Sequence, residues 1–180
     1  MDLICKNRVE TGREQGKKDM VFCIINAKNV QPYKNSKKEN LKKDTKEMVV
    51  SIALAQFRIT DGKIGFPGGK VENYDETLIQ ALCREVKEEI NYDLDVDKLK
   101  PLATFGNEKH NISSFTYDVS LDELDSIVEN ASKAVDYSVE NSGMIKLHLH
   151  KQNIPNILAH NWCGTASKEL ELFMKQLGLI

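Results

Sequence analysis

The feature that most constrains this chain is a glycine turn followed by an acidic helix, in the segment GFPGGKVENYDETLIQALCREVKEEIN at residues 65–91. Gly68 and Gly69 follow Pro67 and predict a tight turn without side chains, where a phosphate chain could approach the backbone. Residues 77–90 predict a helix, because apolar side chains recur every four residues along one face. A backbone turn suited to phosphate therefore lies directly before a helix.

Three glutamates on this helix, Glu85, Glu88 and Glu89, are predicted to cluster, because residues three and four apart are neighbours on a helix. Their like charges would destabilise a bare helix, and a hard divalent cation with oxygen ligands would offset the repulsion. Magnesium suits this arrangement, since proteins hold it with a few carboxylates, waters and substrate phosphates. Arg84 is spaced to pair with Glu88 and to hold a carboxylate from the flank. A solvated acidic face is the alternative, and the preceding glycine turn favours the metal site.

The rest of the chain alternates predicted strands and helices. Strands are predicted at residues 20–25, 48–57, 99–105, 112–119 and 143–149. Ser120 and Glu123 have the spacing of a capping box and open a further helix. The last helix is expected to start around Thr165 and to end at Gly178. This order indicates an α+β or α/β architecture with a mixed sheet.

The composition excludes several classes of protein. The chain has 180 residues with 25 Lys+Arg and 27 Asp+Glu, and its net charge of −2 rules out a uniformly basic nucleic-acid coat but not a local basic patch. The proportions of 41% hydrophobic and 29% charged residues are typical of a globular protein rather than a disordered one. No apolar run approaches the roughly 20 residues of a membrane span. The charged start, MDLICKNRVETG, lacks the apolar stretch of a signal peptide, so we expect an intracellular protein without a membrane partner.

A lysine-rich segment near residues 31–47 separates the first two predicted strands. Six lysines lie there among Asn and Ser residues. The segment is predicted to be a solvated loop. The alternatives are a basic arm that contacts RNA phosphates and a nuclear import signal.

The segment at 65–91 resembles the Nudix box, G-x5-E-x7-R-E-U-x-E-E-x-G-U, in which U is apolar. The matching residues are Gly69, Glu76, Arg84, Glu85, Val86, Glu88 and Glu89. Two positions depart from the pattern. Six residues rather than five separate Gly69 from Glu76, which lengthens a loop. Asn91 replaces the glycine that ends the helix, and Asn is the next most tolerant residue in a left-handed conformation.

A closer resemblance, to the small nucleolar RNA-decapping Nudix enzymes, covers most of the chain from about Met20, with the lysine-rich segment as an insertion. It is carried by the longer loop, by RITDGKIGFP at 58–67, by SLDELDSIVENASKA and by residues 161–179. It implies a single Nudix domain over residues 1–180 with an α+β fold, a mixed β-sheet packed between helices (an α/β/α sandwich), often as a homodimer. It also implies a location in the nucleus (nucleolus or nucleoplasm), the cytoplasm or both.

The resemblance implies metal-dependent cleavage of the cap of mRNA or small nucleolar RNA, with release of a (methyl)guanosine diphosphate. The implied ligands of Mg2+ or Mn2+ are Glu85, Glu88, Glu89, Glu140 and Gly69. These four acids and Arg84 are the expected catalytic residues. Glu140 would bind a further metal ion or orient the attacking water, and a solvated loop carboxylate is the alternative. Glu76 and Arg84 are expected to position the acids.

Base recognition is expected to differ from that of the inosine-preferring members. Phe22 aligns with their histidine on the first strand, and Glu169 aligns with their glutamine in the last helix. A carboxylate at position 169 can accept from the ring N–H and amino group of guanine, which predicts a preference for guanine or a methylated guanine cap. The other expected substrate contacts are Arg58, Phe66 and Trp162. Phe22 or Trp162 would stack on cationic 7-methylguanine. Alternatively, both rings are core residues and Glu169 is an acid favoured in a first helical turn.

Two other functions fit the same sequence. One is a nucleoside diphosphatase that clears free IDP or GDP. The other is a non-catalytic RNA-binding protein, because the subfamily resembles a focal-adhesion-associated protein that has the fold without the catalytic acids. The presence of Glu85, Glu88 and Glu89 favours catalysis.

Overall fold

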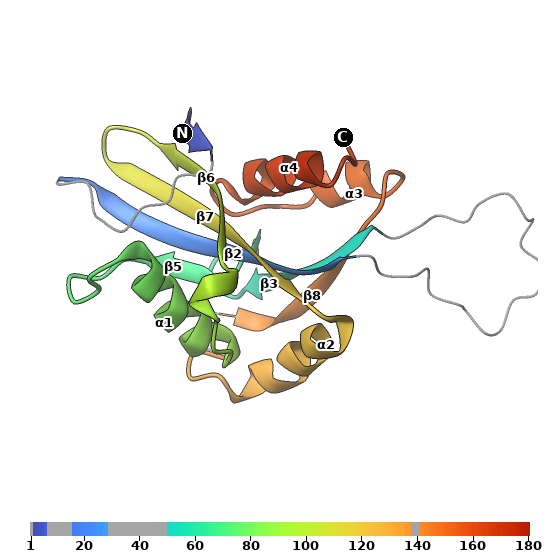
Figure 1. Cartoon of the computed structure of the whole chain (residues 1–180), viewed down its shortest axis with the longest axis horizontal. Helices are drawn as coiled ribbons and strands as arrows, with labels where there is room; N and C mark the ends of the chain where they lie inside the picture. The colour runs from blue at the N-terminus through green and yellow to red at the C-terminus, as the bar shows by residue number, and fades with distance from the viewer. Residues whose placement is uncertain (1, 7–15, 29–49, 138–140) are drawn as a thin grey trace, which may run out of the picture.

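The computed structural model describes residues 2–6, 16–28, 50–137 and 141–180 (Figure 1). Its strands are β1 (Asp2–Lys6), β2 (Lys18–Lys28), β3 (Ser51–Arg58), β4 (Ile64–Gly65), β5 (Gly68–Lys70), β6 (Lys100–Gly106), β7 (His110–Val119) and β8 (Asn141–Leu149). Its α-helices are α1 (Leu78–Ile90), α2 (Leu121–Asn130), α3 (Ile154–Leu158) and α4 (Ala166–Gln176), with short 3-10 helices at Val96–Lys98 and Ala131–Lys133. None of these described helices has the length and apolar character needed to cross a membrane.

The strands of the described part form one mixed sheet. Its order is β1-β6-β7-β2-β3-β4, with β5 also paired to β2 and β8 also paired to β3. β2 and β7 run parallel over ten residue pairs, whereas the other pairs are antiparallel. The central strand β2 therefore has neighbours from three distant parts of the sequence.

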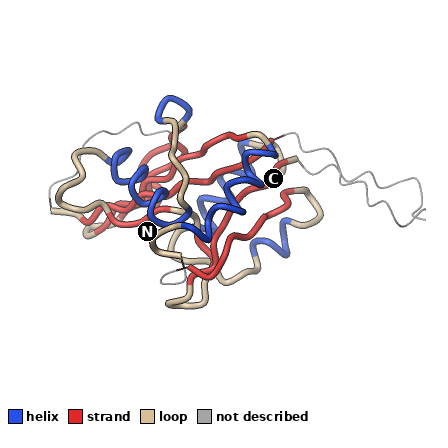
Figure 2. The backbone as a smooth tube through the Cα atoms, turned by 90° about the horizontal axis from the view of Figure 1, so that it is seen from below, coloured by secondary structure: helices blue, strands red, loops and turns tan. Residues whose placement is uncertain are grey.

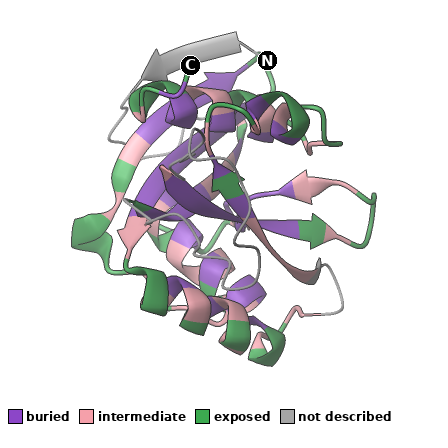
Figure 3. Ribbon diagram, turned by 90° about the vertical axis from the view of Figure 1, so that its right-hand side faces the viewer, coloured by how far each residue is buried: buried purple, intermediate pink, exposed green. Residues whose placement is uncertain are grey.

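Helices cover both faces of this sheet, as Figures 1 and 2 show from two directions. α1 and α2 pack over one apolar core, which includes Val21, Cys23 and Ile25 of β2. α3 and α4 pack over a second core on the opposite face, which includes Ile24. Consecutive residues of β2 enter opposite cores because side chains alternate between the two faces of a strand. Buried residues concentrate along the strands and on the inward faces of the helices (Figure 3). The architecture is the α+β sandwich expected from the sequence.

Most of the predicted strands and helices are present. α2 begins and α4 ends beside the residues that the sequence indicated. The Ser120 hydroxyl accepts from the backbone N–H of Glu123 at 3.1 Å, so Ser120 caps the start of α2 as predicted, and the Glu123 carboxylate accepts from the hydroxyl of Tyr92. Gly178 has a φ of +69° just after α4. The two-residue and three-residue strands β4 and β5, the strand β1 and the short helix α3 were not predicted. The lysine-rich segment at 31–47 lies outside the described residues.

Candidate active site

The acidic helix α1 is held at both ends by local contacts. The Thr77 side chain accepts from the backbone N–H of Gln80 at 3.1 Å and caps the start of the helix. Asn91 ends it with a φ of +53°, in the left-handed region, and its N–H donates to the carbonyl of Lys87 at 3.0 Å. The replacement of glycine by Asn91 is therefore accommodated as expected. α1 packs on β2 and β5, so its carboxylates lie beside the glycine turn.

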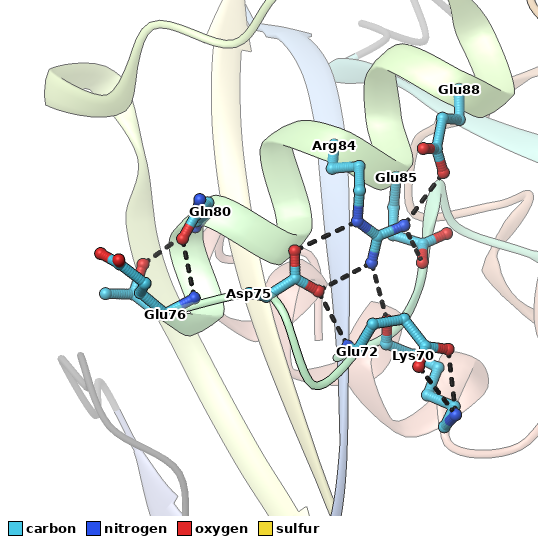
Figure 4. A network of polar contacts seen from close by, with 9 residues as sticks. Lys70, Glu72, Asp75, Glu76, Gln80, Arg84, Glu85 and Glu88 are labelled. Atoms are coloured by element: carbon cyan, nitrogen blue, oxygen red, sulfur yellow. Dashed lines mark hydrogen bonds and ion pairs between the residues drawn. The ribbon is translucent and has the colours of Figure 1, made fainter.

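Arg84 binds two of the expected metal-binding carboxylates. Its Nη1 lies 2.8 Å from Oε1 of Glu85 and 2.9 Å from Oε2 of Glu88, and its Nη2 donates to the carbonyl of Lys70 at 3.0 Å (Figure 4). The contact with Glu88 is the predicted i,i+4 pair. The guanidinium offsets the repulsion between the carboxylates and fixes their positions.

Asp75 holds Arg84 from the opposite side. Its two carboxylate oxygens accept from Nε at 3.1 Å and from Nη2 at 2.9 Å, and Oδ2 also accepts from the N–H of Glu72 at 2.8 Å (Figure 4). Asp75 is only 4% exposed. Its hydrogen bonds are the largest influence that raises the pKa of Arg84 above the ordinary value. We call Arg84, Asp75, Glu85 and Glu88 the arginine cluster.

This arrangement corrects the expectation for Glu76. Glu76 is exposed, its side chain points away from Arg84 in Figure 4, and its backbone N–H donates to Gln80. A sequence signal for Asp75 existed: five residues separate it from Gly69, the spacing that the Nudix pattern gives to its first acid. The extra residue of this chain therefore lies between the first acid and the arginine, not between the glycine and the acid.

Glu89 supports the glycine turn. Its Oε2 accepts from the backbone N–H of Gly68 at 2.7 Å, and the side chain is buried. Gly68 has a φ of +135°, and a Cβ there would lie 2.1 Å from the carbonyl oxygen of Val21. No other residue fits this position, because both the conformation and the space require glycine. Glu89 therefore connects α1 directly to the turn.

Gly69 provides the space for the carboxylate of Glu85. A Cβ at this position would lie 2.4 Å from Oε2 of Glu85. We expect Gly69→Ala to displace that carboxylate and to lower kcat about 10- to 100-fold, since misplacing a catalytic group costs on this scale. The measurement is steady-state hydrolysis alongside thermal unfolding. An unchanged kcat in a folded variant would show that the position of Glu85 is not needed.

The donor chemistry of this region fits a hard divalent cation. Glu85, Glu88 and Glu89 offer only oxygen atoms as ligands. Because Gly69 has no side chain, the backbone at this position lies against the carboxylate of Glu85. Within the described ranges, no three His, Cys, Asp or Glu side chains are gathered closely enough to hold a metal ion, and Arg84 bridges Glu85 and Glu88. Glu140, the fourth expected acid, lies outside the described residues.

A cavity of about 230 Å³ lies beside α4, on the opposite face of the sheet from α1. It is lined by Met20, Phe22, Arg58, Gly65, Phe66, Ile112, Cys163, Gly164, Thr165, Ala166 and Glu169. We call it the α4 cavity. Four of the five expected substrate contacts, namely Phe22, Arg58, Phe66 and Glu169, meet there. They come from three separate parts of the chain.

Trp162, the fifth expected contact, is placed differently. Its ring packs against Phe66 with a centroid distance of 5.7 Å, and its indole N–H donates to the carbonyl of Ile157 at 2.9 Å. It is not among the described residues that line the α4 cavity. The alternative that Trp162 closes the core is therefore favoured over direct stacking on substrate.

Glu169 is a buried carboxyl group at the wall of this cavity. It is 1% exposed, and its Oε1 accepts from the hydroxyl of Thr165 at 2.5 Å. Its Oε2 has no hydrogen-bond partner among the described residues. Burial raises the pKa of Glu169 to about 7, and the Thr165 hydrogen bond opposes this shift. The sequence indicated an acid here but not its burial.

Glu169→Gln is expected to remove a pH-dependent cost to stability. The folded-state pKa of about 7 lies above the ordinary value of 4.5, so ionisation of Glu169 opposes folding. The stability of the wild type relative to the variant should therefore fall as pH rises from about 4.5 to about 7, by about 3 kcal/mol in total, and stay level above that range. Urea unfolding of both proteins at four pH values measures the difference. A constant difference across this range would contradict the prediction.

The segment at 65–69 joins the two parts of the candidate site. Gly65 and Phe66 line the α4 cavity, whereas Gly68 and Gly69 contact Glu89 and Glu85. One continuous segment of five residues therefore contributes to both parts of the candidate site.

Comparison with known proteins identifies the family. The family model described as "Nudt16-like: U8 snoRNA-decapping enzyme-like" matches residues 28–180. The chain belongs to this family. The resemblance stated from the sequence is thus confirmed, and the match includes the Nudix box and the α4 cavity residues other than Met20 and Phe22.

Individual relatives agree with this membership. The Xenopus laevis protein named U8 snoRNA-decapping enzyme is 26% identical over 131 residues, which cover 67% of this chain and 62% of that protein. The Gallus gallus protein named Tudor-interacting repair regulator protein is 29% identical over 134 residues, 71% of this chain and 42% of its own. The alignment thus spans less than two thirds of either curated relative. A crystal structure of a mutT/nudix family protein from Listeria innocua superposes with a TM-score of 0.58 at 14% identity, covering 92% of this chain and 96% of that one, which shows the Nudix fold.

Proposed function

We propose that this chain is a divalent-metal-dependent pyrophosphohydrolase that cleaves the cap of an mRNA or small nucleolar RNA and releases a (methyl)guanosine diphosphate. One observation carries the proposal: the segment at 65–69 connects an aromatic-walled cavity to the carboxylates of α1. A nucleoside diphosphate end has the same two parts, a flat base and an adjacent phosphoric anhydride. The family membership supports this choice of substrate.

The residues of the site have separate roles in this reaction. Water attacks one phosphorus atom, so a P–O bond to water forms as the anhydride P–O bond breaks. Mg2+ or Mn2+, held by Glu85, Glu88 and Glu89 with Glu140 and Gly69 as further ligands, would neutralise the charge that develops on the phosphate oxygens. Arg84 fixes Glu85 and Glu88, and Glu89 fixes the turn through Gly68.

The side chains around the α4 cavity would bind the base. Phe22 and Phe66 offer aromatic faces, which attract a cationic 7-methylguanine by roughly 1 kcal/mol. Arg58 adds a cation at the wall for an anionic substrate. The lysine-rich segment would contact the RNA body, and the protein would act in the nucleus or cytoplasm as a homodimer with one Nudix domain per chain.

Product analysis tests the proposal. The purified chain is incubated with Mg2+ or Mn2+ and a panel of capped RNA, GDP, IDP and NAD. Release of methylated guanosine diphosphate from capped RNA is the expected result. Turnover of free diphosphates with capped RNA untouched would instead make the protein a nucleoside diphosphatase. Binding of RNA without any cleavage would favour a non-catalytic RNA-binding protein.

A further inference from the structure

The loop between β5 and α1 carries a large aromatic side chain that is open to solvent beside the arginine cluster. Tyr74 is 68% exposed, and the guanidinium carbon of Arg84 lies 5.4 Å from the centre of its ring. This contact is a cation–π interaction, which holds the ring against the guanidinium. Arg84 contacts one face of the ring, so another flat group can pack on the remaining face.

The position of Tyr74 separates it from other exposed apolar side chains. Single exposed apolar residues are ordinary on a protein surface, and among the described aromatic residues Phe57 on β3 is also exposed, at 40%. Tyr74, however, contacts the same guanidinium that binds the carboxylates of Glu85 and Glu88 at 2.8 and 2.9 Å. The ring therefore lies one side chain away from two of the expected metal ligands.

Lys70 places a cation next to the same guanidinium. Its backbone carbonyl accepts from Nη2 of Arg84 at 3.0 Å, and its side chain extends away from Arg84 toward Glu72 (Figure 4). The side chain is 57% exposed, and its Nζ lies 2.9 Å from Oε1 of Glu72. An exposed ion pair of this kind is weak, so a phosphate can compete with Glu72 for the ammonium group. We call Lys70 and Tyr74 the Tyr74 surface.

We propose that the Tyr74 surface binds the first RNA nucleotide beyond the cap, with its base stacked on Tyr74 and its phosphate at Lys70. The inference rests on the proposed function, because it requires the anhydride that joins cap and RNA to lie at the carboxylates of α1. The nucleotide that follows this anhydride is then close to those carboxylates, as the Tyr74 surface is. An aromatic ring beside a cation is the combination that binds single-stranded nucleic acid irrespective of its sequence.

Variants of Tyr74 test the stack from the protein side. Tyr74→Ala should lower kcat/KM for capped RNA, relative to kcat/KM for GDP, by about 5- to 100-fold, the scale of one base stacked on an aromatic ring, and mainly through KM. GDP lacks a nucleotide beyond its phosphates, so any effect of the variant on Arg84 and the acids cancels in this ratio. Tyr74→Phe keeps the ring and should retain the wild-type ratio, whereas Tyr74→Leu should resemble Tyr74→Ala.

A capped RNA whose first nucleotide is abasic tests the stack from the ligand side. The wild type should hydrolyse it about 5- to 100-fold less efficiently, in kcat/KM, than the same RNA with a base at that position. Tyr74→Ala should hydrolyse the two RNAs equally, because the variant has no ring on which the base can stack. A wild type that does not distinguish the two RNAs, or a Tyr74→Ala variant that still does, would overturn the inference.

Variants of Lys70 and Glu72 should change RNA binding in opposite directions. Lys70→Gln should raise KM for capped RNA and lower the slope of log KM against log salt concentration by about 0.7, the value for one phosphate of a single strand. Glu72→Gln removes the competing carboxylate and should lower KM for capped RNA about two- to fivefold. The matched controls are Lys98→Gln, at a lysine that is 56% exposed and paired with Asp95, and Glu171→Gln, at an acid paired with a lysine on α4. Both controls should behave as the wild type, and an unchanged salt slope in Lys70→Gln would contradict the phosphate contact.

Product analysis with the wild type, on the same preparation, distinguishes the two possible failures. If capped RNA is cleaved to methylated guanosine diphosphate while Tyr74→Ala keeps the wild-type preference for RNA, the role of the Tyr74 surface is wrong and the proposed function stands. If neither capped RNA nor any free diphosphate is cleaved, the proposed function itself fails, and the role of the Tyr74 surface fails with it.

Discussion

Glu89→Gln is expected to lower the rate of cap hydrolysis by about 10²- to 10³-fold, the scale seen when one charge-stabilising group is removed from an active site. The amide oxygen of glutamine can still accept from the N–H of Gly68, which Glu89 binds at 2.7 Å, so the glycine turn should be retained. The variant would lose the negative charge of the carboxylate that is proposed to bind the metal ion. The measurement is kcat for capped RNA and for GDP with Mg2+ or Mn2+.

Glu76→Gln is the matched control for this variant. It makes the same chemical change at an exposed position just before α1, outside the arginine cluster. It should retain wild-type kcat, and thermal unfolding should show both variants folded. Equal kcat values for Glu89→Gln and the wild type would exclude Glu89 from the chemistry.

Arg84→Met is expected to destabilise the protein by about 3–5 kcal/mol, the cost of leaving buried charge without its partner. Arg84 binds Asp75, Glu85 and Glu88 at 2.8–2.9 Å, and Asp75 has little contact with solvent. The loss of the guanidinium leaves three carboxylates close together. Urea unfolding at pH 7 measures the change, and kcat should fall in any fraction that folds because Glu85 and Glu88 lose their support.

The same experiment distinguishes the two acids that precede the helix. Asp75→Asn should also destabilise the protein markedly, whereas Glu76→Gln should change stability by no more than about 0.5 kcal/mol, as is usual for exposed positions. The double variant Asp75→Asn with Arg84→Met should cost less than the sum of the single changes, since the two groups contact each other. Additive effects, or a larger effect at Glu76, would contradict the arginine cluster.

The secondary structure around the site could be predicted from the sequence because its signals are local. The Thr77 and Ser120 caps, the left-handed Asn91 and the i,i+4 pair of Arg84 with Glu88 each depend on residues within one helical turn. The strands β1, β4 and β5 were missed because short strands carry little periodicity of their own and form by pairing with distant partners.

Which side chains form the site could be determined only from the tertiary structure. The residue spacing along the chain is compatible with a contact of Arg84 with either Asp75 or Glu76. In the structure, the loop before α1 brings Asp75 to Arg84. Trp162 was expected at the substrate; its ring packs against Phe66, its indole N–H donates to the carbonyl of Ile157, and it is not among the described residues that line the α4 cavity.

The sequence by itself determined the family, the acidic helix and the glycine turn, since these are set by residue types at fixed separations along one segment. Only the tertiary structure decided that Phe22, Phe66 and Glu169 surround one cavity and that one oxygen of Glu169 is left without a partner among the described residues. Burial, and the pKa that follows from it, depends on which distant segments pack around a side chain, and no local pattern encodes that.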